Sequence, residues 1–117
     1  MQLNKYFKRQ EFACQCNCGF DTVDTALLDI VTSVRKHFDK PVTVTSGCRC
    51  KKHNEACGGA TESYHLFGKA ADIKVKDVTP SEVMAYLKAE YKDRYGFIEY
   101  STWVHVDCRD VTYRSEL

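Results

Sequence analysis

Two histidines and one aspartate in this 117-residue chain have side chains that suit a zinc ion. His65 and Asp72 are seven residues apart, and Gly68 between them lets the chain turn back. His105 lies near the C-terminus in a run, residues 103–107, whose alternate side chains would share one face of a strand. Three protein ligands with an open fourth position are typical of a catalytic zinc site, because the open position holds the attacking water.

His105 also has a plainer interpretation. A histidine between Val104 and Val106 is, taken alone, more often a structural residue than a ligand. Asp72 has apolar neighbours in sequence, where a carboxylate is costly unless a cation lies beside it. The combination of the two with His65 favours a metal site over three unrelated structural residues.

The composition predicts one globular domain that spans residues 1–117, since the chain is too short for a second module. A net charge of +1 gives no strong attraction to nucleic acid. The chain has no run of about 18 apolar residues, so the sequence predicts no transmembrane helix. The first eleven residues have no apolar stretch of the kind found in signal peptides, so we expect synthesis in the cytoplasm without such a signal.

Cysteine is frequent in this chain, and its seven positions allow more than one interpretation. They are Cys14, Cys16, Cys18, Cys48, Cys50, Cys57 and Cys108. The odd number and the lack of a signal peptide favour reduced thiols over disulfides. The Cys-x-Cys spacings leave open a second, structural zinc site, against packed or exposed thiols. A redox or multi-zinc structural protein without hydrolysis is a further reading.

The pattern of apolar residues predicts the elements that position the candidate ligands. Helices are expected over residues 21–38, with Asp21 as N-cap, and 79–91, with Thr79 as N-cap and Pro80 in the first turn. Strands are expected over residues 41–45 and 69–75, and a short helical turn over residues 51–57. Residues 96–100 and 102–108 predict two short strands or one bent strand. This order indicates an α+β fold with a small, mostly antiparallel sheet.

Several sequence pieces fall in the order and at the separations of a known peptidase family. They are Glu11-Phe12-Ala13-Cys14, residues 41–47 with Arg49 and Cys50, Asn54, Gly58-Gly59, Ser63-x-His65, Gly68-x-Ala70-x-Asp72-Ile73 and Val104-His105-Val106-Asp107. Over residues 4–109 the chain resembles the zinc D-alanyl-D-alanine carboxypeptidase and endopeptidase family. That family cleaves peptidoglycan stem peptides and includes many phage endolysins.

The resemblance implies a fold and a set of roles. The implied fold is the α+β fold shared with the hedgehog signalling domain, with helices packed on one side of the sheet. The implied zinc ligands are His65, Asp72 and His105, and Arg49 would hold a substrate carboxylate through a two-pronged ion pair. The alternative for Arg49 is a surface arginine that stabilises its own loop. Ser63 would bind substrate or orient His65, or else simply form a turn.

The proton acceptor departs from the family pattern. Some relatives carry an acidic residue three positions before the last histidine ligand, where this chain has Thr102. Two acids remain, Asp107 first and Glu99 second, and Glu99 would share the face of His105 only if the strand continues unbroken. Asp107 could instead orient His105, and Glu99 could be a solvated strand residue. Trp103 would line the substrate cleft, although a lone aromatic beside a strand is more often core.

These expectations combine into one predicted function and one alternative. The prediction is a monomeric zinc metallopeptidase that hydrolyses an amide bond in peptidoglycan stem peptides or crosslinks. It would act on the cell wall after release, in phage lysis or as part of a virion. The alternative is a catalytically inactive, zinc-stabilised binding domain of the same fold.

Overall fold

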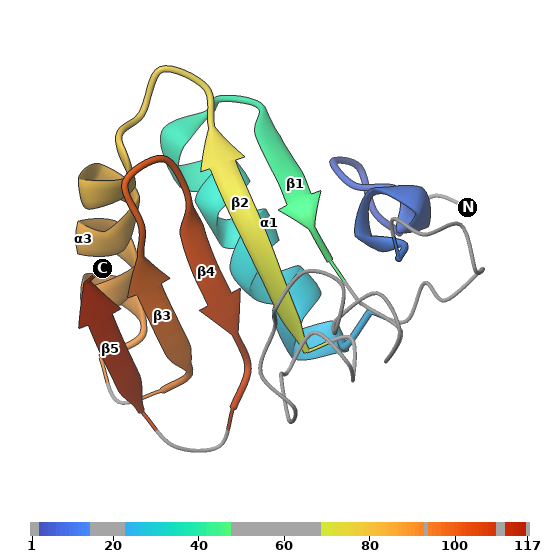
Figure 1. The fold of residues 1–117 in the computed structure, drawn as a ribbon. Helices are drawn as coiled ribbons and strands as arrows, with labels where there is room; N and C mark the ends of the chain where they lie inside the picture. The colour runs from blue at the N-terminus through green and yellow to red at the C-terminus, as the bar shows by residue number, and fades with distance from the viewer. Residues whose placement is uncertain (1–2, 15–22, 48–68, 93, 110–111, 117) are drawn as a thin grey trace.

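The computed structural model describes residues 3–14, 23–47, 69–92, 94–109 and 112–116. Within these ranges the chain forms a five-stranded sheet with strand order β1-β2-β4-β3-β5 (Figure 1). The strands are β1 (Val42–Ser46), β2 (Ala70–Val75), β3 (Gly96–Glu99), β4 (Val104–Asp107) and β5 (Tyr113–Glu116). Every neighbouring pair is antiparallel except β3 and β5, which are parallel.

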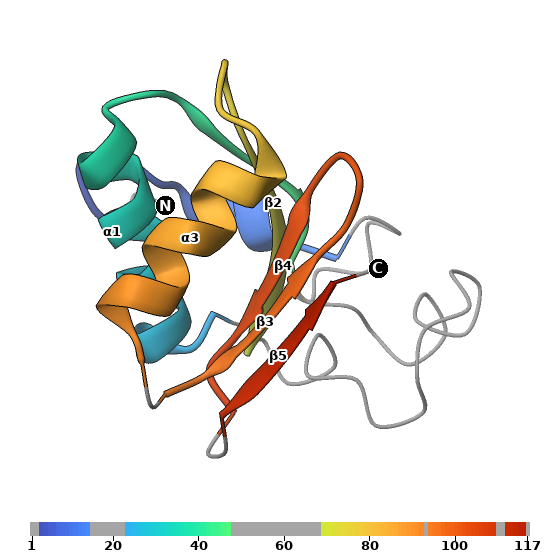
Figure 2. The ribbon, with the colours of Figure 1, turned by 90° about the vertical axis from the view of Figure 1, so that its left-hand side faces the viewer.

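Two α-helices, α1 (Thr25–Phe38) and α3 (Pro80–Glu90), cover one face of this sheet (Figure 2). A short 3-10 helix, η1 (Arg9–Phe12), precedes them. The predicted α+β class, with a mostly antiparallel sheet and helices on one side, is confirmed. None of the described helices is long and apolar enough to cross a membrane.

The helix boundaries follow from side-chain caps. Asp24 caps α1, because its carboxylate accepts a hydrogen bond from the backbone N–H of Ala26 at 2.8 Å. The helix therefore begins later than predicted, and the proposed cap Asp21 lies outside the described residues. Thr79 is the predicted N-cap of α3, and Glu82 makes this cap reciprocal. The predicted helical turn over residues 51–57 also lies outside the described residues.

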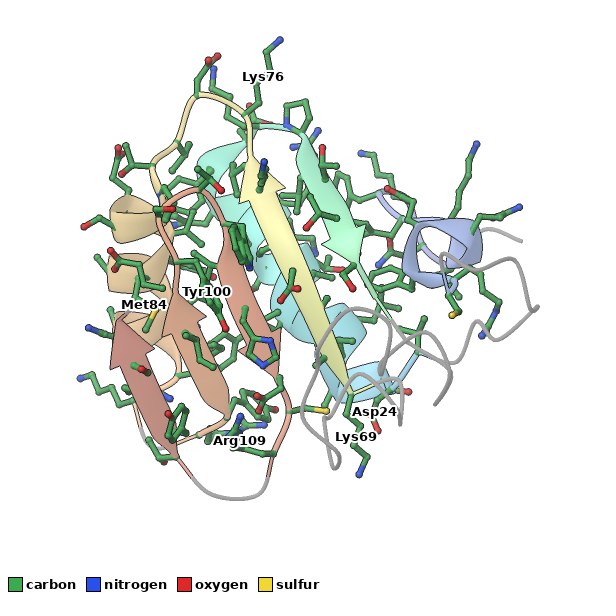
Figure 3. All side chains as sticks on the ribbon, in the orientation of Figure 1. Asp24, Lys69, Lys76, Met84, Tyr100 and Arg109 are labelled. Carbon is green, nitrogen blue, oxygen red and sulfur yellow. The ribbon has the colours of Figure 1, made fainter. Side chains whose placement is uncertain are left out.

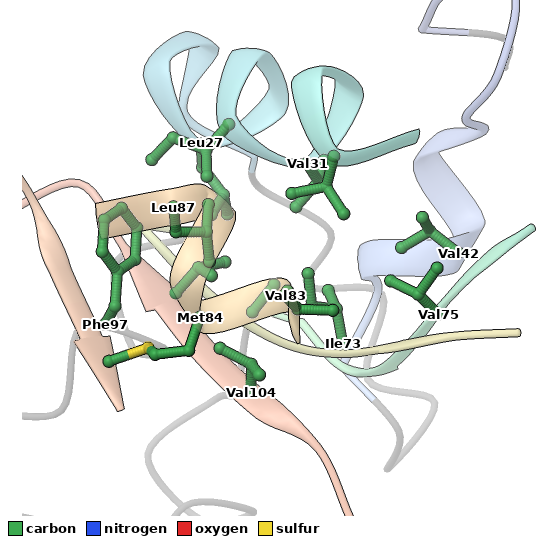
Figure 4. Packing of buried hydrophobic residues seen from close by; sticks show 14 of the residues in the cluster. Leu27, Val31, Val42, Ile73, Val75, Val83, Met84, Leu87, Phe97 and Val104 are labelled. Atoms are coloured by element: carbon green, nitrogen blue, oxygen red, sulfur yellow. The ribbon is translucent and has the colours of Figure 1, made fainter. Parts of the chain in front are cut away.

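The core lies between the two helices and the sheet (Figure 4). Its fully buried members come from every layer and include Phe12, Leu27, Ile30, Val31, Val34, Ile73, Met84, Leu87, Phe97, Val104 and Val106. In β4 the two valines face this core, so the residues that alternate with them face the other side of the sheet. This alternation decides where the candidate ligands point.

Candidate functional site

The candidate site begins with Asp72 and His105, which the sheet places directly opposite each other. Asp72 is at the centre of β2 and pairs with His105 of β4 in the antiparallel register. Directly opposed residues put their side chains on the same face, here the face away from the helices. The His105 Nδ1 and Asp72 Oδ1 atoms are 3.2 Å apart, and both side chains are more than four-fifths buried. Two of the predicted ligands are therefore neighbours.

A second carboxylate contacts the other edge of the imidazole. The Oδ2 atom of Asp107 lies 2.8 Å from Nε2 of His105, and the Asp107 side chain is completely buried. The ring of His105 is thus held between Asp72 at Nδ1 and Asp107 at Nε2. Asp107 shares the face of His105 because it lies two residues further along the same strand.

Arg109 follows β4 (Figure 3). Its side chain binds both oxygens of Asp107. Its Nε donates to Oδ1 at 2.7 Å and its Nη2 to Oδ2 at 2.5 Å, while its backbone N–H donates to Oδ1 at 3.2 Å. The guanidinium also lies against the Tyr113 ring, with 4.6 Å between Cζ and the ring centroid. Gly96 pairs with Asp107 across the sheet and lies directly under the ion pair.

Burial and hydrogen bonds shift the pKa values of His105 and Asp107. Burial alone would lower the pKa of the His105 ring, but its hydrogen bonds to Asp107 and Asp72 outweigh this and raise that pKa. Burial alone would raise the pKa of Asp107, but hydrogen bonds from Arg109 and His105 hold that pKa below its usual value. Asp107 is therefore ionised, and the imidazole contacts a carboxyl group at each of its two nitrogens.

This arrangement fits a cation between Asp72 and His105. A neutral imidazole has one N–H group, and if Nε2 donates it to Asp107, then the Nδ1 lone pair faces a carboxylate oxygen. A proton or a metal ion removes that conflict. Two ligands bound tetrahedrally to zinc at about 2.0–2.1 Å lie roughly 3.3 Å apart, close to the observed 3.2 Å. The donor types and their spacing both suit zinc.

The remaining predicted site residues fall into two groups. His65, Arg49 and Ser63 lie outside the described residues. Five of the seven cysteines do so as well, in residues 15–22 and 48–68, so the possible second zinc site also lies outside the described residues. The described part of the chain holds no group of three or more His, Cys, Asp or Glu side chains placed for a metal ion. Asp72 and His105 thus form two parts of a predicted three-ligand set.

Glu99 and Trp103 belong to the hairpin that joins β3 and β4. The chain turns at residues 100–103, where the Tyr100 N–H donates to the Trp103 carbonyl at 3.0 Å. The unbroken strand required for Glu99 to share the face of His105 is absent: Glu99 pairs with the core residue Val104, and Ile98 stands opposite His105. The Trp103 ring is half-buried and stacks on Tyr100 with centroids 4.4 Å apart.

Sequence reasoning missed Arg109 and Gly96. The spacing of His105, Asp107 and Arg109 does indicate that their side chains share one face, since residues two apart along an extended chain point to the same side. The role of Gly96 depends on a cross-strand partner, which the local sequence does not reveal.

Comparison with known proteins identifies the family. The sequence model of the Peptidase M15 family matches residues 5–107, a span that includes Asp72, His105 and Asp107 and ends two residues before Arg109. No curated protein matches the chain. Because the match covers most of the 117 residues, the chain belongs to the Peptidase M15 family.

Proposed function

We propose that the protein is a zinc-dependent peptidase that hydrolyses an amide bond in peptidoglycan stem peptides or crosslinks. One observation carries the proposal: the His105 ring is held by Asp107 at Nε2 and faces Asp72 across 3.2 Å at Nδ1. Membership of a peptidase family supports the reaction class. The proposed substrate places the protein at the cell wall, during phage lysis or as part of a virion, and we expect it to act as a monomer.

The proposed zinc ligands are His65, Asp72 and His105. Asp72 supplies a charged oxygen, and His105 supplies Nδ1 with its ring orientation set by Asp107. Zinc bound there would supply a Lewis acid that polarises the scissile carbonyl and activates a water molecule. The low exposure of Asp72 and His105 keeps bulk water away, which strengthens the electrostatic interactions at the site.

Substrate binding is assigned to Arg49, Ser63 and Trp103. For Arg49 and Ser63 the assignment rests on the sequence resemblance, in which the arginine forks onto a peptide carboxylate. Trp103 stacks on Tyr100 in the hairpin before β4, only two residues from His105. A flat aromatic pair beside the ligands offers apolar surface to a bound peptide.

Asp107 is better placed to orient His105 than to accept a proton from water. Both of its oxygens already accept hydrogen bonds from Arg109, and Oδ2 also contacts His105. A lowered pKa further weakens it as a base. Glu99 pairs with the core residue Val104 and is therefore on the opposite face of the sheet from His105. We thus assign no general base among the described residues.

The second candidate is a zinc-binding domain of this fold that does not cleave its ligand. Two points favour it: Thr102 stands where the resemblance implies an acid in some relatives, and both oxygens of Asp107 are engaged. Such a domain would hold zinc through the same residues and bind peptidoglycan peptides without hydrolysis.

Digestion of purified peptidoglycan, followed by mass spectrometry of the released fragments, separates the two candidates. The protein is tested zinc-loaded, zinc-free and as His105→Ala. His37→Ala is the matched control, since His37 stacks on Tyr86 at the interface of the two helices, away from the site. We expect fragments from zinc-loaded wild type and His37→Ala only, and their masses name the bond. Cleavage by zinc-free protein would overturn the proposal, and zinc binding without cleavage would favour the binding domain.

A further inference from the structure

We infer that Arg109 is a positioning residue for the metal ligand His105 and acts through Asp107. This inference rests on the proposed function, because it concerns the same ligand. It adds a residue beyond the span matched by the family, which ends at Asp107. Arg109 fixes Asp107, and the Asp107 carboxylate accepts a hydrogen bond from Nε2–H of His105. Nδ1 is thereby directed at Asp72.

The first step is the ion pair between Arg109 and Asp107. The guanidinium forms two hydrogen bonds, one to each carboxylate oxygen, and the backbone N–H of Arg109 adds a third. A two-pronged pair of this kind fixes the plane of the carboxylate as well as its position. Lysine could supply the charge but not the fork. Asp107 therefore cannot rotate its Oδ2 atom away from His105 without breaking the pair.

The second step is the enclosure of the ion pair. Asp107 is completely buried, and the Arg109 side chain is 17% exposed. A buried carboxylate needs compensating donors, and here they are Arg109 and His105. A Cβ at Gly96 would come within 2.4 Å of both partners, so the pair lies against this glycine. The guanidinium also lies over the ring of Tyr113. Strands β3 and β5 thus hold the pair in one geometry.

The third step is the effect on the imidazole. With Oδ2 of Asp107 fixed 2.8 Å from Nε2, the proton of a neutral ring belongs on Nε2, and Nδ1 presents its lone pair toward Asp72. Carboxylates that bind a ligating histidine in this way set its tautomer and orientation. Arg109 is one contact further from the metal, so its loss should loosen the ring rather than remove a ligand.

The test measures zinc affinity by competition with a chromophoric chelator in Arg109→Gln and Arg109→Lys. We expect the zinc dissociation constant of Arg109→Gln to rise roughly tenfold or more, and Arg109→Lys to recover part of the loss. Arg35→Gln is the matched control, because it also removes an arginine–carboxylate pair, between α1 and its C-cap residue Asp39. This variant should bind zinc as wild type does. Circular dichroism of each variant confirms that it is folded.

A second measurement follows the His105 ring directly by ¹⁵N NMR, with its signals identified by their absence from His105→Gln. In wild type we expect Nε2–H, and in Arg109→Gln a mixture with Nδ1–H. Wild-type zinc affinity in folded Arg109→Gln, or Nδ1–H in wild type, would overturn the inference. If Arg109→Gln does not fold, the zinc affinity of Arg109→Lys and the tautomer of His105 in wild type test the inference instead. If wild type binds no zinc, the proposed function fails, and the tautomer in zinc-free wild type at a pH where the ring is neutral still tests the positioning role.

Discussion

Replacing Gly96 with alanine inserts one methyl group beneath the Asp107–Arg109 pair without removing any charged group. The Cβ would lie 2.4 Å from Nε of Arg109 and 2.4 Å from Oδ1 of Asp107, whereas ordinary contact begins at 3.4 Å. Each of these atoms must therefore move by about 1 Å. A shift of this size breaks the 2.7 Å hydrogen bond between them or displaces strand β3.

The expected cost follows from two opposing effects. Overpacking a well-filled site costs about 1–3 kcal/mol. Alanine restricts the unfolded chain relative to glycine, which returns about 0.4–1 kcal/mol. The free energy of unfolding of the zinc-free protein should therefore fall by about 1–2 kcal/mol, which lowers its melting temperature by roughly 5–10 °C in a domain of this size. Zinc affinity should fall as well, because Oδ2 of Asp107 shifts relative to His105.

A double-mutant cycle with Arg109→Ala isolates the steric effect. Denaturant unfolding is measured for zinc-free wild type, both single variants and the double variant. Removing the guanidinium makes room for the new methyl group, so Gly96→Ala should cost about 1 kcal/mol less in the Arg109→Ala background. An equal cost in both backgrounds would refute the claim that Gly96 makes room for this pair.

Three further predictions concern single residues at or near the site. Asp107→Asn keeps the shape but places an NH₂ group where Arg109 or Nε2 of His105 now donates, so zinc affinity measured by chelator competition should fall at least about tenfold; unchanged affinity would contradict this. Asp72→Asn removes a charged ligand, and equilibrium dialysis should find well under one zinc per chain; a full equivalent would exclude Asp72 as a ligand. Burial and the nearby Asp24 raise the pKa of Cys108 to about 11, so its alkylation should be roughly a hundredfold slower at pH 8 than in the unfolded protein and should accelerate with pH up to that value; a rate independent of pH would contradict this.

Much of the fold follows from local sequence signals. The β-branched residues of β1 and the N-cap Thr79 with Pro80 of α3 are short-range signals, and the structure forms a strand and a helix there. Strand β5 was not predicted, because its four residues have no apolar alternation of their own. Its place beside β3 depends on distant contacts: Arg114 donates to the carbonyl oxygens of Tyr91, Arg94 and Tyr95. Pattern analysis within a short window does not detect contacts of this kind.

The candidate site was predictable in its residue types but not in its register. Asp72 and His105 were selected by donor chemistry, and the sheet does place them opposite each other. The face on which Glu99 lies depends on whether residues 99–107 form one strand or two. The hairpin at residues 100–103 makes two strands and places Glu99 on the face opposite to that of His105. A slip of one residue reverses the face of a strand side chain, so this question decides which acid can reach the ligands.

The Arg109–Asp107 pair shows why burial matters to such predictions. From the sequence, Asp107 was an available acid close to His105. In the structure it is completely buried and bound on both oxygens, which favours a role in orienting the ring. That environment is created by Gly96 and Tyr113, which belong to two other strands.

The most direct test of the central claim is a crystal structure of the zinc-loaded protein with diffraction data collected at the zinc absorption edge. The account predicts an anomalous peak about 2 Å from Nδ1 of His105 and about 2 Å from a carboxylate oxygen of Asp72, with Nε2 still bound to Asp107. A peak at Nε2, or a zinc ion held by other residues away from Asp72 and His105, would contradict it.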